Sequence, residues 1–248
     1  MTPMPERLNV EINGLGGRLL NLLFPPRCAN CKQTGSALCP QCFDRIKRLQ
    51  PPFCERCSHP LVSAAAPCPE CRAHPRRITC IRAAAWHEGV VRQAIHALKY
   101  NRRRDVAAPL AMLLAPVCAQ FQPQPDFITS VPLHPERQRA RGYNQAELLA
   151  EQTARRLRCT CVHVLERTRA TADQIGLSAQ ERRGNVADAF RVSASRDLTA
   201  KRVVLIDDVC TTGATLDACA DALFARGAAA VYGVTVARAH QANRTLPK

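Results

Sequence analysis

One continuous stretch near the end of the chain, Arg202 to Thr215, constrains the fold more than any other segment. It begins with a short apolar run rich in β-branched residues, Val203 to Ile206, which is typical of a strand buried on both faces. Two carboxylates, Asp207 and Asp208, stand at the end of that strand, and a turn rich in hydroxyl groups follows. Apolar residues then recur at helical spacing from Leu216 to Phe224. This order of strand, acidic pair, turn and helix predicts an open α/β sheet with a binding site at the carboxyl end of the strand.

The turn after the acidic pair has the properties of an anion-binding loop. Backbone N–H groups in the turn and in the first helical turn lack intrahelical partners, and the helix dipole adds partial positive charge. Gly213 lets the backbone come close to a ligand, and the neighbouring threonines add hydroxyl donors. A phosphomonoester fits such a loop. Because two carboxylates would repel a phosphate, they need another ligand, either sugar hydroxyls or a Mg²⁺ ion that is itself bound to oxyanions.

Asp207 to Thr215 resembles the motif by which type I phosphoribosyltransferases bind 5-phosphoribosyl 1-pyrophosphate (PRPP). The resemblance implies that Asp207 and Asp208 are the catalytic acidic pair and hold the ribose 2′- and 3′-hydroxyls, with Mg²⁺ accompanying PRPP. It implies a 5′-phosphate loop made of Cys210, Thr211, Thr212, Gly213, Ala214 and Thr215. An ordinary strand–turn–helix with a capping aspartate would explain one acid and one threonine, but not the whole string.

Four Cys-x-x-Cys pairs lie close together in the first third of the chain. Each pair directs two thiolates toward one tetrahedral metal, and two pairs complete a four-sulfur zinc site, so the eight cysteines predict two structural Zn²⁺ sites. We favour sequential pairing over an interleaved cross-brace. The first site then has Cys28, Cys31, Cys39 and Cys42, and the second has Cys54, Cys57, Cys68 and Cys71.

Two other interpretations of these cysteines are weaker. A disulfide framework needs an oxidising compartment, and no secretion signal supports one. A redox Cys-x-x-Cys would be single and would sit at a helix start within a βαβ unit. The segment is also rich in proline and poor in core-forming residues, so we expect it to need metal to fold.

Beyond Arg76, strand-like and helix-like segments alternate, which predicts a parallel sheet with helices on both faces. Asp105 is expected to cap one of the helices. The expected strands are 78–86, 127–131, 162–165, 203–206 and 231–236, and the expected helices are 90–100, 105–119, 143–156 and 216–224. By its resemblance, this α/β fold is of the type I phosphoribosyltransferase class. We expect three parts: an amphipathic segment at 1–24, a double zinc ribbon at 25–75 and a phosphoribosyltransferase-like domain at 76–248.

Two polar segments follow expected strands and are candidates for further ligand contacts. The first is an arginine-rich loop after the strand at 127–131, well placed to hold a diphosphate. Its expected pyrophosphate-binding residues are Leu133, His134, Arg137 and Arg141, whereas Arg139 is more typical of a solvated loop. The second has the polar character of a flexible loop that closes over a site, with Arg169, Thr171 and Gln174 as its candidate residues.

Several motifs together resemble the ComF family of competence-associated proteins. They are Val131-Pro132-Leu133, Arg141-Gly142-Tyr143-Asn144-Gln145, the Arg-x-Arg-x-Thr-x-x-Gln-x-x-Leu pattern from Arg167 to Leu177, His96-Ala97-Leu98-Lys99-Tyr100, and the cysteine-rich head. The resemblance runs from about Leu19 to near the C-terminus. It implies a cytoplasmic part in the uptake or processing of single-stranded DNA during natural transformation, with competence or DNA-translocation proteins as candidate partners.

The charge balance favours an anionic ligand. The 35 Lys and Arg residues against 20 Asp and Glu give a net charge of +15, which suits nucleic acid or phosphorylated small molecules. With one Trp, three Tyr and seven Phe, a wide base-stacking platform is not expected. No apolar stretch reaches the roughly 18 to 20 residues of a membrane span. The apolar piece from Leu19 to Phe24 is too short for a signal sequence, so we expect a cytoplasmic protein.

Two hypotheses about function follow. In the first, a ComF-like protein binds PRPP with Mg²⁺ and handles single-stranded DNA. In the alternative, the chain is an active phosphoribosyltransferase that transfers the 5-phosphoribosyl group to an unidentified nucleobase-like acceptor. The basic segment at 82–104, with His96, Lys99, Tyr100 and the arginines 102 to 104, would read a base, hold DNA phosphates or form a solvated helix end. The sequence leaves these three roles open, and with them the question of catalysis.

Overall fold

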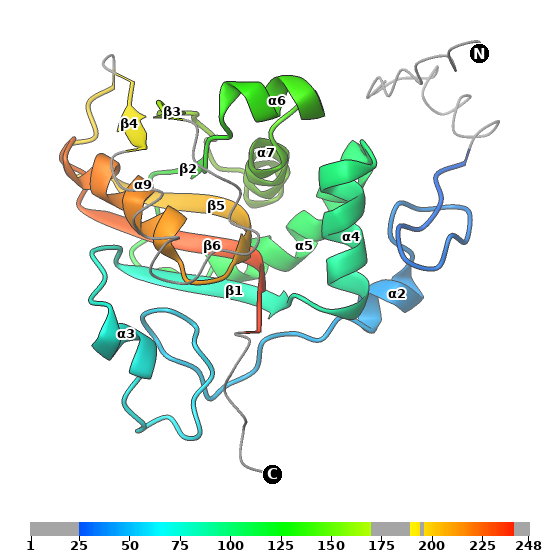
Figure 1. Ribbon diagram of the computed structural model, residues 1–248, viewed down its shortest axis with the longest axis horizontal. Helices are drawn as coiled ribbons and strands as arrows, with labels where there is room; N and C mark the ends of the chain where they lie inside the picture. Colours follow the sequence, from blue (N-terminus) through cyan, green and yellow to red (C-terminus); the bar gives the residue numbers. More distant parts are fainter. Residues whose placement is uncertain (1–24, 170–188, 194–195, 241–248) are drawn as a thin grey trace.

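The computed structural model describes residues 25–169, 189–193 and 196–240. A four-stranded sheet in the order β1-β6-β5-β2 forms its centre, and every neighbouring pair of strands is parallel. The strands are β1 (Cys80–Trp86), β2 (Phe127–Ser130), β5 (Arg202–Cys210) and β6 (Ala230–Arg238). The expected parallel sheet is confirmed, and β5, which carries the acidic pair, has a partner strand on each side (Figure 1).

Alternate side chains of β5 enter two different cores. Val204 and Ile206 belong to one buried cluster, and Val203 and Leu205 belong to the other. Successive residues of a strand point to opposite faces of a sheet, so a strand covered on both faces is apolar at every position. The first cluster contains α4 (Gly89–Tyr100), α5 (Ala107–Cys118) and α7 (Gln145–Leu157), and the second contains α9 (Ala214–Phe224) (Figure 1).

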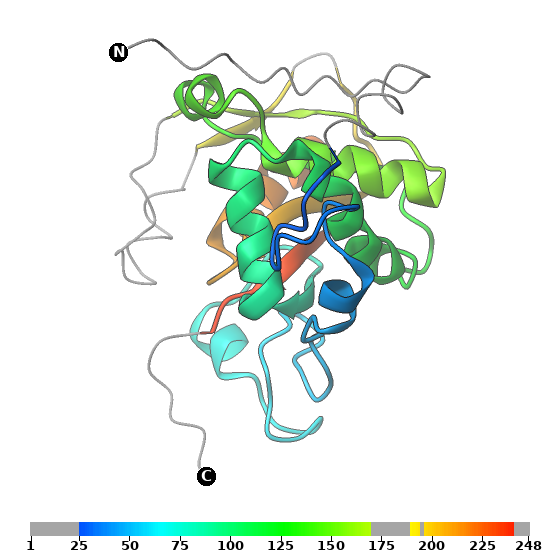
Figure 2. The ribbon, with the colours of Figure 1, turned by 90° about the vertical axis from the view of Figure 1, so that its right-hand side faces the viewer.

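The cysteine-rich part joins the sheet at the outer edge of β1. Between residues 25 and 75 the structure has two five-residue helices, α2 (Pro40–Asp44) and α3 (Pro69–Ala73). The segment between the two cysteine groups runs beside β1, where Leu49 N donates to Ala84 O at 3.1 Å and Trp86 N donates to Lys47 O at 3.0 Å. These bonds attach the cysteine-rich part to the body of the molecule (Figure 2).

The arginine-rich segment after β2 is a helix, so the prediction of a loop there is wrong. Helix α6 spans Pro135–Arg141, with a proline in its first turn. His134 is its N-cap and accepts a bond from Glu136 N at 3.4 Å, and Gly142 ends the helix in the left-handed conformation, with φ 84°. Pro at the start and Gly after the end are recognised helix signals, and here they outweigh the charge of the segment.

The predicted strand at 162–165 is also wrong. The strand of this segment, β3 (Leu165–Arg167), pairs antiparallel with β4 (Phe190–Val192) in a separate two-stranded sheet. A single bridge between Cys161 and Ile128 links the segment to the parallel sheet. Short apolar runs predict burial, but they do not specify which strand becomes the partner.

Asp105 does not cap α5. A 3₁₀ turn at Arg104–Val106 precedes the helix, and Val106 occupies the N-cap position without a side-chain bond. The Asp105 carboxylate instead accepts two bonds from the Arg103 guanidinium, at 2.8 and 2.7 Å.

Strand β5 is longer than predicted. It continues through both aspartates to Cys210, because its backbone stays paired with β6 as far as Arg238. The three-part division of the chain stays a prediction, and the amphipathic segment at 1–24 lies outside the described residues. Within the described ranges, no helix is long and apolar enough to cross a membrane.

Candidate functional site

A cavity of about 1000 Å³ lies at the carboxyl end of β5. Three segments that are far apart in the sequence line it: the acidic pair with the loop after β5, the region of α6, and one face of α4. Parallel strands end at the same edge of a sheet, and ligands of such sheets bind there. The lining contains these residues expected at the site: Asp207, Asp208, Cys210, Thr211, Thr212, Gly213, Ala214, Thr215, Leu133, Arg137, Arg141, His96, Lys99 and Tyr100.

Asp208 forms an ion pair with a lysine from α4. Its carboxylate is 5 % exposed, and its Oδ2 lies 2.7 Å from Lys99 Nζ. Burial by itself would lower the pKa of Lys99, but the neighbouring Asp208 carboxylate outweighs it and raises that pKa above its ordinary value. Lys99 is therefore held as a cation beside the acidic pair. The sequence left the role of Lys99 open and did not predict this contact.

Asp207 has an unusual protonation equilibrium. Its Oδ1 accepts a bond from Asp208 N at 2.8 Å. Burial, together with the negative charge of Asp208, raises the pKa of Asp207 from 3.8 to about 7. The folded chain therefore binds a proton at Asp207 between about pH 4 and about pH 7 that the unfolded chain has already released.

The stability of the protein should reflect this proton. Where the folded state binds more protons, stability falls as the pH rises, so ionised Asp207 destabilises the fold most above about pH 7. We expect Asp207→Asn to remove that effect and to stabilise the chain relative to wild type more at about pH 8 than at about pH 5. Urea unfolding of both proteins at the two pH values measures the difference. An equal difference at both pH values would contradict the shifted pKa.

The loop after β5 turns sharply into α9. Gly213 is the N-cap of this helix, with φ 81°, a conformation that favours glycine. Thr212 Oγ1 accepts a bond from Ala214 N at 3.3 Å. A Cβ atom at Gly213 would lie 2.7 Å from Arg76 Nη1 and 2.8 Å from Ile81 Cδ1, so the position also lacks room for a side chain. The predicted anion loop thus has the local geometry that such a loop needs.

Helix α6 presents two of its three arginines to the cavity. Arg137 and Arg141 line it, and they share a helix face because they are four positions apart. Arg139 lies on another face, in keeping with its expected solvated role, and His134 lies at the N-cap outside the cavity lining. Of the expected flexible-loop residues, Arg169 lies outside the lining, and Thr171 and Gln174 fall outside the described residues.

Further cations in the cavity were missed by sequence reasoning. Arg92 lies on α4 one turn before His96, and Arg167 comes from the end of β3. The spacing of Arg92, His96 and Lys99 is the signal that would have placed all three on one face of the helix. The cavity therefore combines two carboxylates with an excess of positive side chains, as an anionic ligand bearing hydroxyl groups requires.

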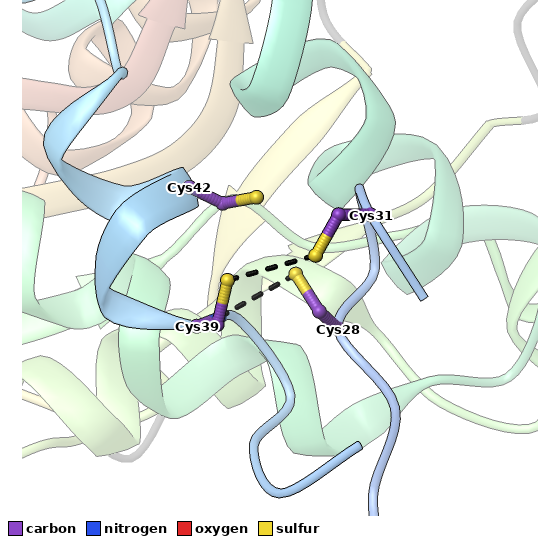
Figure 3. Close-up of side chains that lie close together, drawn as sticks. All are labelled: Cys28, Cys31, Cys39 and Cys42. Carbon is purple, nitrogen blue, oxygen red and sulfur yellow. Dashed lines mark hydrogen bonds between the residues drawn. The ribbon is translucent and has the colours of Figure 1, made fainter. Parts of the chain in front are cut away.

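The eight cysteines of the Cys-x-x-Cys pairs gather into two groups of four, and the sequential pairing is confirmed. Within each group the Sγ atoms lie within 4.8 Å of one another. The first group points inward to one centre (Figure 3), and its Cys31 and Cys39 sulfurs are 3.7 Å apart. In the second group, the Cys57 and Cys68 sulfurs are 3.6 Å apart. A tetrahedral site with Zn–S bonds of about 2.3 Å has sulfurs about 3.8 Å apart, so both groups fit structural Zn²⁺.

Comparison with known proteins agrees with both the cysteine groups and the parallel α/β sheet. Residues 19–72 match the family model of the double zinc ribbon domain, and residues 144–247 match that of the phosphoribosyl transferase domain. DNA utilization protein YhgH of Escherichia coli K12 is 34% identical over 220 residues, which cover 85% of this chain and 96% of that protein.

Two further relatives carry names from competence. Competence protein F of Haemophilus influenzae is 33% identical over 205 residues, covering 78% of this chain and 89% of the relative. Competence protein ComFC of Bacillus subtilis is 26% identical over 209 residues, covering 81% of this chain and 84% of the relative. With its two four-cysteine sites, its parallel sheet and these relatives, the chain, which joins a double zinc ribbon to a phosphoribosyltransferase domain, belongs to the ComF family.

Proposed function

We propose that this protein binds PRPP together with Mg²⁺ in the cavity at the end of β5 and takes part in the uptake or processing of single-stranded DNA in the cytoplasm. The observation that carries the proposal is the convergence of three groups in one cavity. These are the acidic pair Asp207 and Asp208, the loop at Gly213, and the two arginines Arg137 and Arg141.

Each group suits one part of PRPP. The loop before α9 offers backbone N–H groups and threonine hydroxyls to the 5′-phosphate. Asp207 and Asp208 accept hydrogen bonds from the ribose hydroxyls, and Arg137 and Arg141 face the pyrophosphate. Carboxylate oxygens are also suitable ligands for Mg²⁺, which supplies positive charge to the pyrophosphate when bound.

Titration calorimetry with PRPP and Mg²⁺ tests this site directly. Wild type should bind, and the double variant Asp207→Asn, Asp208→Asn should lose affinity by about 100-fold or more, since each carboxylate hydrogen bond contributes about tenfold or more. The variant Asp44→Asn, Asp221→Asn is a matched control, because it removes the same charge at two exposed positions. Equal binding by wild type and the Asp207, Asp208 variant, or no binding by wild type, would refute the proposal.

The DNA role rests on different support. The net charge of +15 favours polyanions, and relatives of this chain are named for DNA utilization and competence. Binding of a single-stranded oligonucleotide, followed by fluorescence anisotropy, should weaken steeply as salt is raised, because phosphate contacts release counterions. Absence of binding at low salt would count against a direct DNA contact. Partner proteins from competence or DNA translocation remain part of this same proposal.

A second function, phosphoribosyl transfer, is favoured by the size of the cavity. At about 1000 Å³ it is at the upper end of ligand pockets, so it has room for an acceptor beside PRPP. In that reaction the bond between C1 and the pyrophosphate oxygen breaks, pyrophosphate leaves with the electron pair, and C1 bonds to the acceptor. Arg137 and Arg141 would stabilise the leaving group, and the acidic pair would hold the ribose as positive charge develops at C1. Release of pyrophosphate from PRPP during an acceptor screen is the test.

A further inference from the structure

Two buried arginines lie between the second cysteine group and the anion loop. The side chain of Arg76 is 2 % exposed, and Arg238 as a whole is 1 % exposed. Arg76 comes soon after Cys71, and Arg238 is the last residue of β6. The described cavity lining contains neither of them. They therefore act on the site through other residues.

Arg76 forms hydrogen bonds to the anion loop and to the helix that follows it. Its Nη2 donates to Thr212 O at 2.6 Å, and its Nη1 donates to Asp217 Oδ2 at 2.6 Å. One planar guanidinium thus joins the loop to the first turn of α9, and it lies directly against Gly213. This contact fixes the left-handed turn at Gly213, which determines where the N–H groups of the loop point.

Arg76 is in turn held by the second cysteine group. Its backbone oxygen accepts a bond from Arg56 Nη2 at 2.7 Å. Arg56 stands between Cys54 and Cys57, and its backbone N donates to Cys54 Sγ at 3.4 Å. The path from metal ligand to loop therefore passes through two arginines in direct contact.

Arg238 provides a second connection between the same parts. Its Nη1 donates to Cys57 O at 2.7 Å and contacts Cys210 Sγ at 3.6 Å. Ser58, next to Cys57, donates to Ile81 O at 2.9 Å, and the side chain of Ile81 supports Gly213. The knuckle formed by Cys54 and Cys57 thus supports both the end of β5 at Cys210 and the turn at Gly213.

The first cysteine group is placed differently. Cys28, Cys39 and Cys42 belong to the buried cluster of α4 and α5, on the other side of the sheet from α9 (Figure 2). Nearby, Arg27 O accepts a bond from Arg103 Nη2 at 2.7 Å, just beyond α4. The first group therefore supports the α4 wall, and the second supports the anion loop.

We propose that Arg76 and Arg238 are positioning residues that connect the second cysteine group to the 5′-phosphate loop. Metal in that group then sets the affinity for the phosphate end of PRPP, whereas metal in the first group does not. The inference rests on the proposed PRPP site. Its physical basis is that a Cys-x-x-Cys knuckle without metal loses its structure, which releases Arg56 and the carbonyl of Cys57 from their bonds.

The test separates the two ends of the ligand. PRPP, ribose 5-phosphate and pyrophosphate, each with Mg²⁺, are titrated into wild type and into four variants, and bound zinc is measured per chain. Arg76→Lys and Arg238→Lys keep the charge but lose the fork of the guanidinium. Cys68→Ser removes a ligand of the second group that lies outside the described connection. Cys31→Ser is the matched control in the first group.

We expect Arg76→Lys and Cys68→Ser to weaken ribose 5-phosphate binding by about tenfold or more, with a smaller loss for Arg238→Lys, and pyrophosphate binding to stay within about twofold. Cys31→Ser should weaken ribose 5-phosphate binding clearly less than Cys68→Ser does, because its group supports the α4 wall rather than the 5′-phosphate loop. Unchanged ribose 5-phosphate affinity in Arg76→Lys, parallel loss of both half-ligands, or equal effects of the two cysteine variants would each overturn the inference. If Cys68→Ser does not fold, the ribose 5-phosphate affinity of Arg76→Lys alone decides whether the inference stands. A wild type that fails to bind PRPP would instead overturn the proposed site, and this inference with it.

Discussion

Removal of zinc should unfold the segment between residues 25 and 75. Nine apolar residues in this segment are buried, and five of them are metal ligands: Cys28, Cys39, Cys42, Cys54 and Cys57. The remaining four are Ala29, Leu38, Ile46 and Leu49, and the two helices of the segment have five residues each. So few apolar side chains cannot offset the loss of chain entropy, whereas binding of a structural zinc ion supplies about 10–16 kcal/mol.

The unfolding can be followed by zinc content and thiol reactivity. Native mass spectrometry should find two zinc ions per chain, and a strong chelator should release both and make eight further thiols reactive. The variants Cys31→Ser and Cys68→Ser should each retain one zinc ion. A reductant without chelator should change nothing, which separates zinc from a disulfide framework. A chelated protein with unchanged thiol reactivity and circular dichroism would contradict the prediction.

Replacing Lys99 by methionine should leave a buried carboxylate without its cation. The side chain of Asp208 is 5 % exposed, and its Oδ2 lies 2.7 Å from Lys99 Nζ. Breaking a buried ion pair by removing one partner destabilises proteins by about 3–5 kcal/mol, and we expect about 3 kcal/mol here, since Lys99 is 22 % exposed.

A double-mutant cycle isolates this interaction. The variants are Lys99→Met, Asp208→Asn and their combination, compared by urea unfolding at about pH 8. The combined variant should be more stable than Lys99→Met, because it carries no unpaired charge. Strictly additive losses would show that the ion pair does not contribute to stability. Because both residues line the cavity, PRPP binding by each variant would also show whether the pair must open for the ligand.

Much of the site followed from local patterns in the chain. The strand, turn and helix around Asp207 were predicted from periodicity, and the Gly213 turn has the expected form. The spacing of the cysteines predicted two groups of four and their sequential pairing, which the structure confirms. In both cases the residues that act together lie within a few turns of chain, so their spacing restricts their geometry. The roles of the residues that line the cavity stay predictions.

The wrong predictions share one cause: a local sequence pattern does not specify which distant or neighbouring residue will form the contact. The segment at 162–165 has strand composition, but its strand pairs with Phe190–Val192 rather than within the parallel sheet. The charge of the segment with Arg137 and Arg141 favours a loop, although Pro135 and Gly142 mark a helix. Asp105 precedes a helix, yet its carboxylate accepts a hydrogen bond from Arg103 instead of capping that helix. Each of these outcomes depends on a competing contact whose strength the sequence pattern does not show.

The sequence by itself therefore determined the parallel α/β class, the two cysteine groups and the position of the acidic pair before the turn at Gly213. Those features rest on spacing, periodicity and turn chemistry, which act over a few residues. Only the tertiary structure decided that Lys99 pairs with Asp208, and that Arg76 binds Thr212 from 136 positions away. Such contacts arise when the sheet order brings distant elements together, and burial then makes each charge depend on the neighbour it meets there.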